Sequence, residues 1–193
     1  MLFPTIKEKL PMTINYSIRA ENFGDANAIT DLHHDAFKGD EKIAAIVPRL
    51  RQLDAAFPTT SLVAQGASGE VLGHTMLSHS WLDAPDRLID ILVLSPLGVA
   101  TSAQKNGIGI ALIERAIAQA SRMTAPILFL EGNPKFYGPR GFEASKTLGI
   151  RSPSLRIPEP ALQMVRLPSY KKEMTGTLVY RELWWELDSV GLR

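Results

Sequence analysis

The sequence predicts an α+β fold in which a mixed, mostly antiparallel central sheet is flanked by helices. Three observations predict this fold. Strand patterns with short connections fill residues 61–99, a strongly amphipathic helix pattern covers 107–122, and a wholly apolar segment follows at 126–130. Strands with short connections form an antiparallel meander, whereas a strand, a helix and a second strand form a right-handed parallel crossover. With 193 residues, 45% of them hydrophobic, the chain can bury one full core.

The chain divides into a short N-terminal extension and one domain. Residues 1–12 carry two prolines and alternate apolar with charged positions, so they lack the apolar block of a secretory signal. Glycine and proline are spread along the rest of the chain as turn markers, without a linker or a fixed-period repeat. We therefore predict a single domain over residues 13–193.

The first part of this domain predicts one strand and two helices. Residues 15–20 alternate apolar and polar side chains, which is the pattern of a half-buried strand. Apolar residues then recur at three- and four-residue spacing over residues 29–37 and again over 41–53, which predicts two amphipathic helices. The second helix is expected to end before Pro58, because the residue that precedes a proline disfavours helical geometry.

The middle of the chain predicts the meander and the crossover. Strands are expected over residues 61–65, 71–79 and 88–99, with turn signals between them. The helix over 107–122 has one apolar face that packs on the sheet, and the apolar segment over 126–130 is typical of a central strand covered on both faces.

Pro96 interrupts the last strand of the meander. Proline cannot donate a hydrogen bond to a neighbouring strand, so we expect the pairing to break near it, at a bulge or an edge.

The C-terminal part predicts short elements. One or two helical turns are expected over residues 134–139, a strand over 142–145, and closing strands over 162–166 and 177–183. The pair Trp184 and Trp185 follows the last strand, and such adjacent aromatic residues usually divide between core and surface.

Composition and charge exclude several kinds of site and partner. The chain has no cysteine, which excludes disulfides, thiolate zinc sites and cysteine nucleophiles and favours a reducing, cytoplasmic location. Lys and Arg number 21 and Asp and Glu number 20, so the formal charge of +1 argues against nucleic acid or an anionic membrane as a partner. The most apolar run, residues 91–100, is shorter than the roughly 17–25 residues of a membrane-spanning helix.

The clearest chemical signal lies between the strand over 88–99 and the helix that begins at Gly107. The first turn of a helix exposes unpaired N–H groups, and Gly107 and Gly109 let phosphate oxygens approach the backbone, while Lys105 adds a charge. A Walker A loop would require Gly-Lys-Ser/Thr, and the dinucleotide fingerprint would require glycine at Leu112, so neither motif is present. A glycine-rich helix start that serves packing alone is the alternative.

The spacing in this loop resembles a family motif. Gln104-x-x-Gly107-x-Gly109 matches R/Q-x-x-G-x-G/A, the coenzyme A pyrophosphate loop of the GCN5-related N-acetyltransferase (GNAT) superfamily. Gln104 stands in place of the more frequent arginine. This difference removes one charge and leaves Lys105 as the fixed cation of the loop.

A second GNAT-like motif follows in the family's order. The apolar strand leads to Asn133, and Tyr137-x-x-x-Gly-Phe comes shortly after it. Together with residues 176–180, these features resemble a bacterial subgroup of predicted N-acetyltransferases with an extended C-terminal segment, over about residues 13–185. That subgroup commonly has Asp or His at the position of Asn133 and a Tyr-Tyr pair where this chain has Phe136 and Tyr137.

The resemblance implies a fold, a cosubstrate and a set of site residues. The sheet should splay where the acyl-CoA arm enters, and acetyl-CoA should be the cosubstrate, without a metal. The N–H of Val99 or its neighbour would polarise the acetyl carbonyl, and Tyr137 would be the catalytic general acid for the leaving thiolate. The implied cofactor-binding residues are Leu97, Gly98, Val99, Gln104, Lys105, Asn106, Gly107, Ile108, Gly109, Ile110, Asn133 and Phe136.

Two of these roles have structural alternatives. Tyr137 could be a packing aromatic whose hydroxyl binds a backbone carbonyl. Asn133 could bind the pantetheine amide or could fix its own loop.

We predict an enzyme that moves an acetyl group directly from acetyl-CoA to a primary amine, since no cysteine is present to form an acyl-enzyme. The acceptor is expected to be a small-molecule or peptide amine, and a homodimer is compatible with the sequence. The alternatives are a non-catalytic acyl-CoA-binding or regulatory module, and a structural domain without cofactor.

The general base is not selected by the sequence. Five side chains are conceivable, and for each an ordinary structural role is the alternative: His74, His79, Asp83, Asp90 and Glu131. The two histidines on one strand are separated by an odd number of residues, so they should face opposite sides of the sheet. The adjacent pair His33 and His34 lacks i, i+4 spacing and makes a poor metal site, so packing or solvent exposure is expected there.

Overall fold

Nine strands form one mixed sheet within residues 14–38, 40–53 and 59–191, which are the residues that the computed structural model describes. The strands are β1 (Tyr16–Ala20), β2 (Thr60–Gly66), β3 (Val71–Asp83), β4 (Leu88–Val99), β5 (Ile127–Glu131), β6 (Glu143–Ala144), β7 (Ile150–Arg151), β8 (Leu162–Arg166) and β9 (Gly176–Val179). Their main order is β1-β2-β3-β4-β5-β8-β6, and β9 pairs with both β3 and β7. The predicted extension over residues 1–12 lies outside the described residues.

Most neighbouring strands run antiparallel. The first four strands form the predicted meander, and the parallel pairs are β4 with β5 and β7 with β9. Helix α3 (Ile108–Ala120) connects β4 to β5, so the predicted crossover is present. The fold prediction of a mixed, mostly antiparallel sheet is confirmed.

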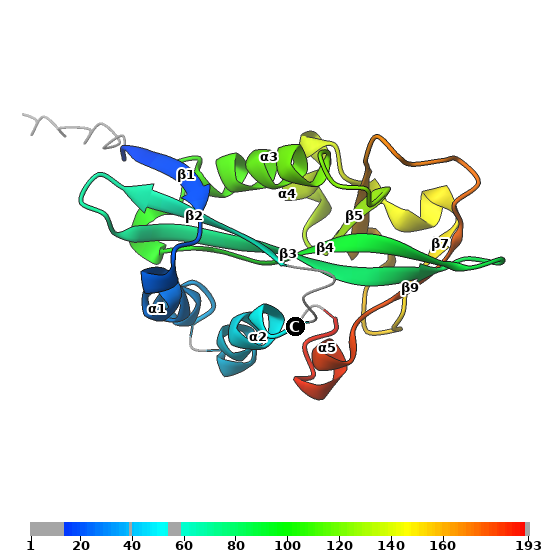
Figure 1. Cartoon of the computed structure of the whole chain (residues 1–193), viewed down its shortest axis with the longest axis horizontal. Coiled ribbons are helices and arrows are strands. Elements are labelled where there is room, and N and C mark those ends of the chain that lie inside the picture. The colour runs from blue at the N-terminus through cyan, green and yellow to red at the C-terminus, as the bar shows by residue number, and fades with distance from the viewer. Residues whose placement is uncertain (1–13, 39, 54–58, 192–193) are drawn as a thin grey trace, which may run out of the picture.

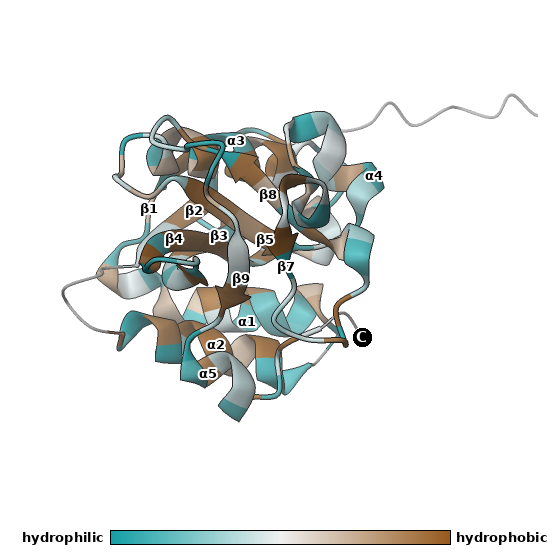
Figure 2. Cartoon of the chain, turned by 90° about the vertical axis from the view of Figure 1, so that its right-hand side faces the viewer, coloured by the Kyte–Doolittle hydropathy of each residue, from teal (hydrophilic) through white to brown (hydrophobic). Residues whose placement is uncertain are grey.

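Helices cover both faces of the sheet. α3 and α4 (Pro134–Tyr137) lie on one side, and α1 (Ala26–Ala36), α2 (Glu41–Arg51) and α5 (Glu182–Glu186) lie on the other (Figure 1). Strands rich in apolar residues lie between helices with hydrophilic outer surfaces (Figure 2). Five short 3-10 helices complete the described chain: η1 (Phe23–Asp25), η2 (Thr101–Ala103), η3 (Gly138–Arg140), η4 (Ser145–Leu148) and η5 (Glu159–Ala161).

The sheet separates two buried apolar clusters. The cluster under α3 includes Leu112 and Leu128, and the cluster on the other side includes Met76 and Phe129. α1, α2 and α3 therefore bury apolar faces that their sequence patterns predicted.

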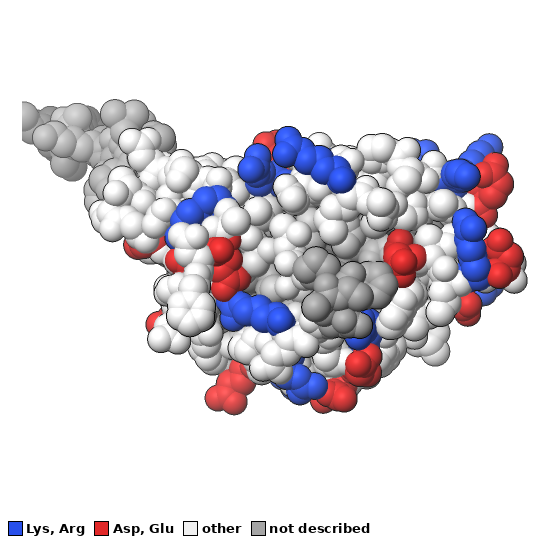
Figure 3. Space-filling model, viewed as in Figure 1, with Lys and Arg blue, Asp and Glu red and all other residues white. Residues whose placement is uncertain are grey.

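Charged side chains of both signs are interspersed on the face in Figure 3. Some of them join elements that are distant in the sequence. Arg49 of α2 pairs with Glu186 of α5 at 2.5 Å, and Lys42 pairs with Asp188 at 2.9 Å. These pairs hold the C-terminal segment against α2.

The prediction of a closing strand over residues 177–183 is wrong in its second half. β9 ends at Val179, and the chain then turns to form α5. Packing explains the difference, because Trp184 is only 4% exposed in the core while Trp185 is 41% exposed. A strand could divide the two indoles between its faces, but the helix does so while also packing on α2.

β4 has an unpaired edge beyond its midpoint. β5 pairs with β4 only at Leu92 and Val93, although β4 runs on to Val99. On its other edge, the register with β3 shifts between Thr75 and Leu77. The break in pairing that Pro96 predicted is therefore present, and the pairing of β4 with β5 has already ended at Val93, which confirms the expected splay.

Candidate active site

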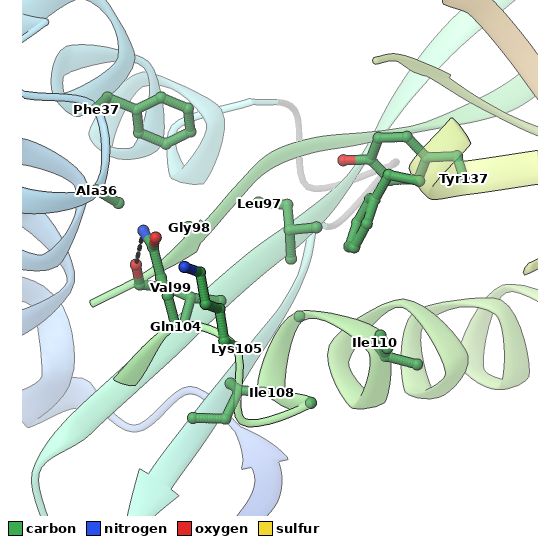
Figure 4. A pocket seen from close by; sticks show the side chains of 13 residues that line it. Ala36, Phe37, Leu97, Gly98, Val99, Gln104, Lys105, Ile108, Ile110 and Tyr137 are labelled. Carbon is green, nitrogen blue, oxygen red and sulfur yellow. Dashed lines mark hydrogen bonds between the residues drawn. The ribbon is translucent and has the colours of Figure 1, made fainter. Parts of the chain in front are cut away.

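A pocket of about 430 Å³ wraps the unpaired edge of β4 (Figure 4). It is lined by Ala36, Phe37, Leu97, Gly98, Val99, Gln104, Lys105, Gly107, Ile108, Gly109, Ile110, Phe136 and Tyr137. Of the thirteen predicted site residues, all but Asn106 and Asn133 line this pocket. The structure thus brings together the two sequence motifs, which lie on α3 and α4.

The start of α3 is built to leave its first N–H groups available. Gly107 precedes the helix in the left-handed region, with φ of 80°, a conformation that costs glycine little. An added Cβ at Gly109 would lie 3.6 Å from Val99 and 3.8 Å from Phe136, so this glycine faces the pocket. The first four N–H groups of a helix have no partner within it, and the helix dipole is positive there. This end of the pocket therefore suits an anion.

The loop before α3 is held by its own side chains and by α1. The Asn106 amide donates to the carbonyls of Ala103 and Gln104 at 3.2 and 3.0 Å. The N–H of Thr101 donates to the carboxylate of Asp35 on α1 at 2.6 Å. Asn106 thus fixes the loop from within, which explains why it does not line the pocket.

Gln104 and Lys105 belong to this loop, and Gln104 binds the end of β4. The Gln104 amide donates to the carbonyl of Val99 at 3.2 Å, as Figure 4 shows. The Lys105 side chain extends into the same space (Figure 4). Because the Gln104 amide is uncharged, the positive charge near the start of α3 comes from Lys105 and the helix dipole.

The unpaired edge of β4 presents backbone donors to the pocket. Ala100 donates its N–H to Leu72 of β3 at 3.0 Å. Successive residues of a strand direct their N–H groups to opposite edges, so Val99 and Leu97 direct theirs away from β3. These N–H groups lie on the side where the pocket opens.

Tyr137 is positioned by aromatic packing. Its ring makes edge contacts with Phe136 and Phe142, at centroid distances of 4.9 and 5.8 Å. Any side chain at Gly132 would collide with it, because an added Cβ would lie 2.2 Å from the Tyr137 ring. The hydroxyl points into the pocket (Figure 4). Burial raises the pKa of Tyr137 to about 12 despite an opposing effect of Arg140, so the phenol is protonated at neutral pH.

Asn133 occupies the position before α4. Its side-chain oxygen accepts a hydrogen bond from the N–H of Lys135 at 3.0 Å, which caps the helix. Of the two roles weighed for Asn133, this contact corresponds to the one that fixes the loop.

None of the five candidate bases is among the lining residues of the pocket. His79 Nε2 lies 2.7 Å from Asp90. Glu131 accepts hydrogen bonds from the Tyr180 hydroxyl at 2.9 Å and from the N–H of Gly191 at 3.0 Å. Burial raises the pKa of Glu131 against the opposing effect of these bonds. Glu131 therefore anchors the C-terminal segment to β5.

The histidines of α1 lie apart. His33 is fully buried and its Nε2 lies 2.7 Å from Nδ1 of His74, whereas His34 is partly exposed. Within the described residues, no group of three or more His, Asp and Glu side chains could hold a metal ion. Among the same residues, no helix has the length and apolarity needed to span a bilayer.

Two lining residues, Ala36 and Phe37, were not predicted as site residues. The spacing on α1 assigned both to its apolar face, which is usually buried in the core. They line the pocket because α1 ends at this point and Gly98 on the facing strand has no side chain. A glycine within a strand marks a close approach of another group, so Gly98 carried a signal for this contact.

The comparison with curated proteins finds an acetyltransferase. The chain is 28% identical to an uncharacterized N-acetyltransferase, YjhQ, of Escherichia coli strain K12, over 133 residues. These residues are 68% of this chain and 72% of that protein. No model of a known protein family matches the chain.

Solved structures share the fold. The GNAT family N-acetyltransferase YhbS from Escherichia coli, in complex with CoA, superposes with a TM-score of 0.78 at 25% identity, over 89% of this chain and 92% of that one. A GNAT family acetyltransferase from Brucella melitensis, in complex with acetyl-CoA, superposes with a TM-score of 0.69 at 27% identity, over 88% of this chain and 98% of that one.

Proposed function

We propose that this chain, a member of the GCN5-related N-acetyltransferase (GNAT) superfamily of acetyl-CoA-dependent N-acetyltransferases, transfers the acetyl group directly to a primary amine. The acceptor is a small-molecule or peptide amine, and the reaction takes place in the cytoplasm. One observation carries the proposal. A single pocket joins the anion-binding start of α3, the unpaired edge of β4 and the buried phenol of Tyr137.

The residues of this pocket fit acetyl-CoA. The N–H groups at the start of α3, together with Lys105, suit the diphosphate, because both place positive potential where Gly109 leaves space. The unpaired edge of β4 suits the pantetheine arm, whose amides can pair with it like an added strand. When bound, acetyl-CoA supplies an activated acyl carbon and a thiolate leaving group.

The backbone of β4 supplies the oxyanion contact. The N–H of Val99, or that of Leu97, lies on the unpaired edge and can donate to the acetyl oxygen as negative charge develops there. This donor is held by the sheet, so it needs no reorganisation during the reaction.

Tyr137 supplies a hydrogen bond to the departing sulfur. A thiol has an ordinary pKa of about 8.5. Against the Tyr137 pKa of about 12, complete proton transfer from the isolated phenol would be uphill by about 5 kcal/mol. We therefore infer that Tyr137 donates a hydrogen bond to the sulfur and completes the transfer as the attacking nitrogen gives up its own proton to the phenol oxygen, which restores the phenol.

The test combines binding with turnover. Calorimetry measures CoA binding, and CoA release is followed with a panel of a polyamine, an aminoglycoside, a free amino acid and a lysine-containing peptide. Tyr137→Phe is expected to lower turnover by roughly 10²–10⁴-fold and to leave the CoA dissociation constant unchanged, because the hydroxyl acts on the leaving group.

Tyr170→Phe is the matched control. This tyrosine also packs against the apolar core but lies outside the pocket, so both turnover and binding should stay as in the wild type. Undiminished turnover in Tyr137→Phe would exclude the phenol from the reaction. A wild type that binds CoA but acetylates no amine of the panel would instead indicate a non-catalytic acyl-CoA-binding module.

A further inference from the structure

Three polar side chains form a hydrogen-bonded chain through the layer between the sheet and α1. Ser61 Oγ lies 2.8 Å from Nε2 of His74, and Nδ1 of His74 lies 2.7 Å from Nε2 of His33. Both imidazoles are fully buried. The chain runs from the start of β2 through β3 to α1, and we call it the Ser61–His74–His33 chain.

One end of the chain lines an outer pocket, and the other end lies behind the wall of the active-site pocket. Ser61 lines an outer pocket of about 470 Å³ together with Glu21 and Arg51. At the other end, the His33 ring lies against Gly98, where an added Cβ would be 2.8 Å from His33 Nδ1. Gly98 lines the candidate active site. The three side chains therefore extend from an outer pocket to the layer directly behind Gly98, on the α1 side of the active-site pocket.

The inner end of the chain has an unused nitrogen. Buried polar atoms nearly always have a hydrogen-bond partner. His33 Nδ1 has none among the residues that the structure describes, although the side chain is fully buried. Phe37, which lines the active-site pocket, stacks on the same imidazole with 5.7 Å between ring centroids. His33 Nδ1 thus lies directly behind the residues that form the α1 side of that pocket.

The surroundings hold both imidazoles neutral. Burial, reinforced by Arg51 and His34, lowers the pKa of His33 to about 4. Burial, followed by His33 and Arg51, also lowers the pKa of His74 well below its ordinary value, against an opposing effect of Asp25. A neutral imidazole has one donor and one acceptor nitrogen. Each ring can therefore take a proton on one side while releasing one on the other.

The charges nearest to the chain are themselves paired. Arg51 lies 2.6 Å from Glu21, and Arg19 lies 2.6 Å from Asp25. No charged partner within the described residues lies in hydrogen-bond contact with either imidazole. The chain is thus composed of neutral groups that are linked end to end.

We propose that the Ser61–His74–His33 chain is a proton relay that carries the proton lost by the amine from the active site to the outer pocket. The proposal rests on the proposed function. The ammonium nitrogen loses its proton, through one water beside Gly98, to His33 Nδ1, and His33 Nε2 passes its own proton to His74 Nδ1. His74 Nε2 then protonates Ser61 Oγ, which releases its original proton to water in the outer pocket.

The proton balance closes at each atom. Every group that gains a proton releases another, so each side chain of the relay ends neutral while one positive charge crosses it, and only the tautomers of the two rings change. After the amide has left, one proton passes back along the chain from water in the outer pocket to water in the emptied active site and restores the starting tautomers, so the relay keeps the proton away from the amine only while the amine attacks. The three side chains act on the amine only through the water, so they are positioning residues.

The test is the pH dependence of turnover, measured by CoA release with the amine of the panel that is acetylated fastest. His33→Gln and His74→Gln keep a polar side chain that can hydrogen-bond, but an amide cannot exchange protons in this way. At pH 7 we expect kcat to fall about 10- to 100-fold in each variant. The deficit should shrink to about 3-fold or less as the pH approaches the amine pKa of about 10.4, where about half of the amine is already neutral.

Three further variants separate the relay from structural damage. His34→Gln changes the adjacent, partly exposed histidine outside the chain and should leave the pH profile of the wild type unchanged. At the outer end, Ser61→Ala should reproduce the low-pH deficit and Ser61→Thr should restore the wild-type profile, because threonine keeps the hydroxyl. Ser61 is partly exposed, so its substitution should disturb folding less. If His33→Gln and His74→Gln do not fold, the comparison of Ser61→Ala with Ser61→Thr still tests the relay.

The outcomes separate the relay from the proposed function. A deficit of equal size at every pH, with CoA affinity unchanged, would overturn the relay and leave the acetyltransferase intact. A wild type that binds CoA but acetylates no amine would overturn the proposed function and the relay together. A deficit confined to low pH in all of the relay variants supports the relay.

Discussion

The two sides of β4 present opposite chemistry to one pocket. On the α3 side are the free N–H groups of a helix start and the charge of Lys105, which together favour an anion. On the α1 side are Phe37 and, behind Gly98, two buried imidazoles whose pKa values burial lowers. The α3 side concentrates positive charge, whereas the α1 side holds the two imidazoles in their neutral form.

Because of this difference, the two sides of the pocket are suited to different roles in the reaction. The α3 side binds through backbone and charge, whereas the α1 side is suited to proton transfer through neutral rings. Among the described residues that line the pocket there is no carboxylate to favour the ammonium form of an amine that enters between the two sides. We infer that the pocket stabilises the amine in its neutral, nucleophilic form, which is the form that can attack a thioester.

The largest effect is expected when low pH forces the α1 side to accept charge. The pKa of His33 is about 4 in the folded protein and about 6.5 when unfolded. Below pH 6.5 the unfolded chain therefore binds more protons, so the stability present above that pH is lost as the pH falls to about 4. His33 alone accounts for about 3 kcal/mol, and His74 adds to this loss. Urea unfolding at pH 7 and at pH 4 measures the difference.

The corresponding control removes the titrating ring. His33→Gln should lose less stability between these two pH values than the wild type, because the amide has no proton to gain. The raised pKa of Glu131 acts in the opposite direction in both proteins and so cancels in the comparison. Equal losses of stability in the variant and the wild type would show that His33 already carries its charge, or titrates normally, in the fold.

A somewhat smaller effect is expected from filling the α3 side. Gly109→Ile would place a branched side chain between Val99 and Phe136, where even a Cβ is already in van der Waals contact. Overpacking of this kind costs about 1–3 kcal/mol, so we expect CoA affinity to fall about 10- to 100-fold. Calorimetry with CoA measures the change. Gly24→Ala, where an added Cβ meets nothing within 4 Å, should bind CoA like the wild type.

The CoA affinity of Gly109→Ile decides whether the α3 side is the anion-binding side of the pocket. Retained affinity in Gly109→Ile, with a stably folded protein, would mean that the diphosphate does not lie at the start of α3. The anion would then have to bind elsewhere, and the α3 side would be a packing surface only.

The α3 side could be predicted from the sequence because its geometry is local. Gln104, Gly107 and Gly109 lie within six residues, and the left-handed conformation at Gly107 is a property of that residue. The strand, the loop and the amphipathic helix follow one another directly, so spacing alone places them together. The predicted cofactor-binding residues of this segment, except Asn106, line the pocket for this reason.

The α1 side could not be predicted because it depends on tertiary contacts. His33 and His74 are separated by 41 residues and meet only through the packing of α1 on β3. The same reason explains the missed helix α5, whose Trp184 is fixed by packing on α2 and not by local periodicity. In the sequence the only histidine next to His33 is His34 on the same helix, whereas the histidine that His33 contacts in the fold, His74, lies on a strand.

The smallest effect is expected from the single charge on the α3 side. Lys105 has φ of 64°, and asparagine tolerates this left-handed conformation, so Lys105→Asn removes the charge with little backbone strain. We expect CoA affinity to fall about 3- to 5-fold at low ionic strength, as for other exposed charges near a helix start. The difference in CoA affinity between variant and wild type should disappear in high salt, because screening then removes the attraction between Lys105 and the diphosphate in the wild type.

The salt dependence distinguishes charge from shape at this position. Lys172→Asn removes an equal charge at an exposed position outside the pocket and should leave the CoA affinity unchanged at every ionic strength. A Lys105→Asn deficit that persists in high salt would instead show that the lysine positions the loop. In that case the positive character of the α3 side would come from its backbone alone, and the contrast with the α1 side would rest on N–H groups and not on a side chain.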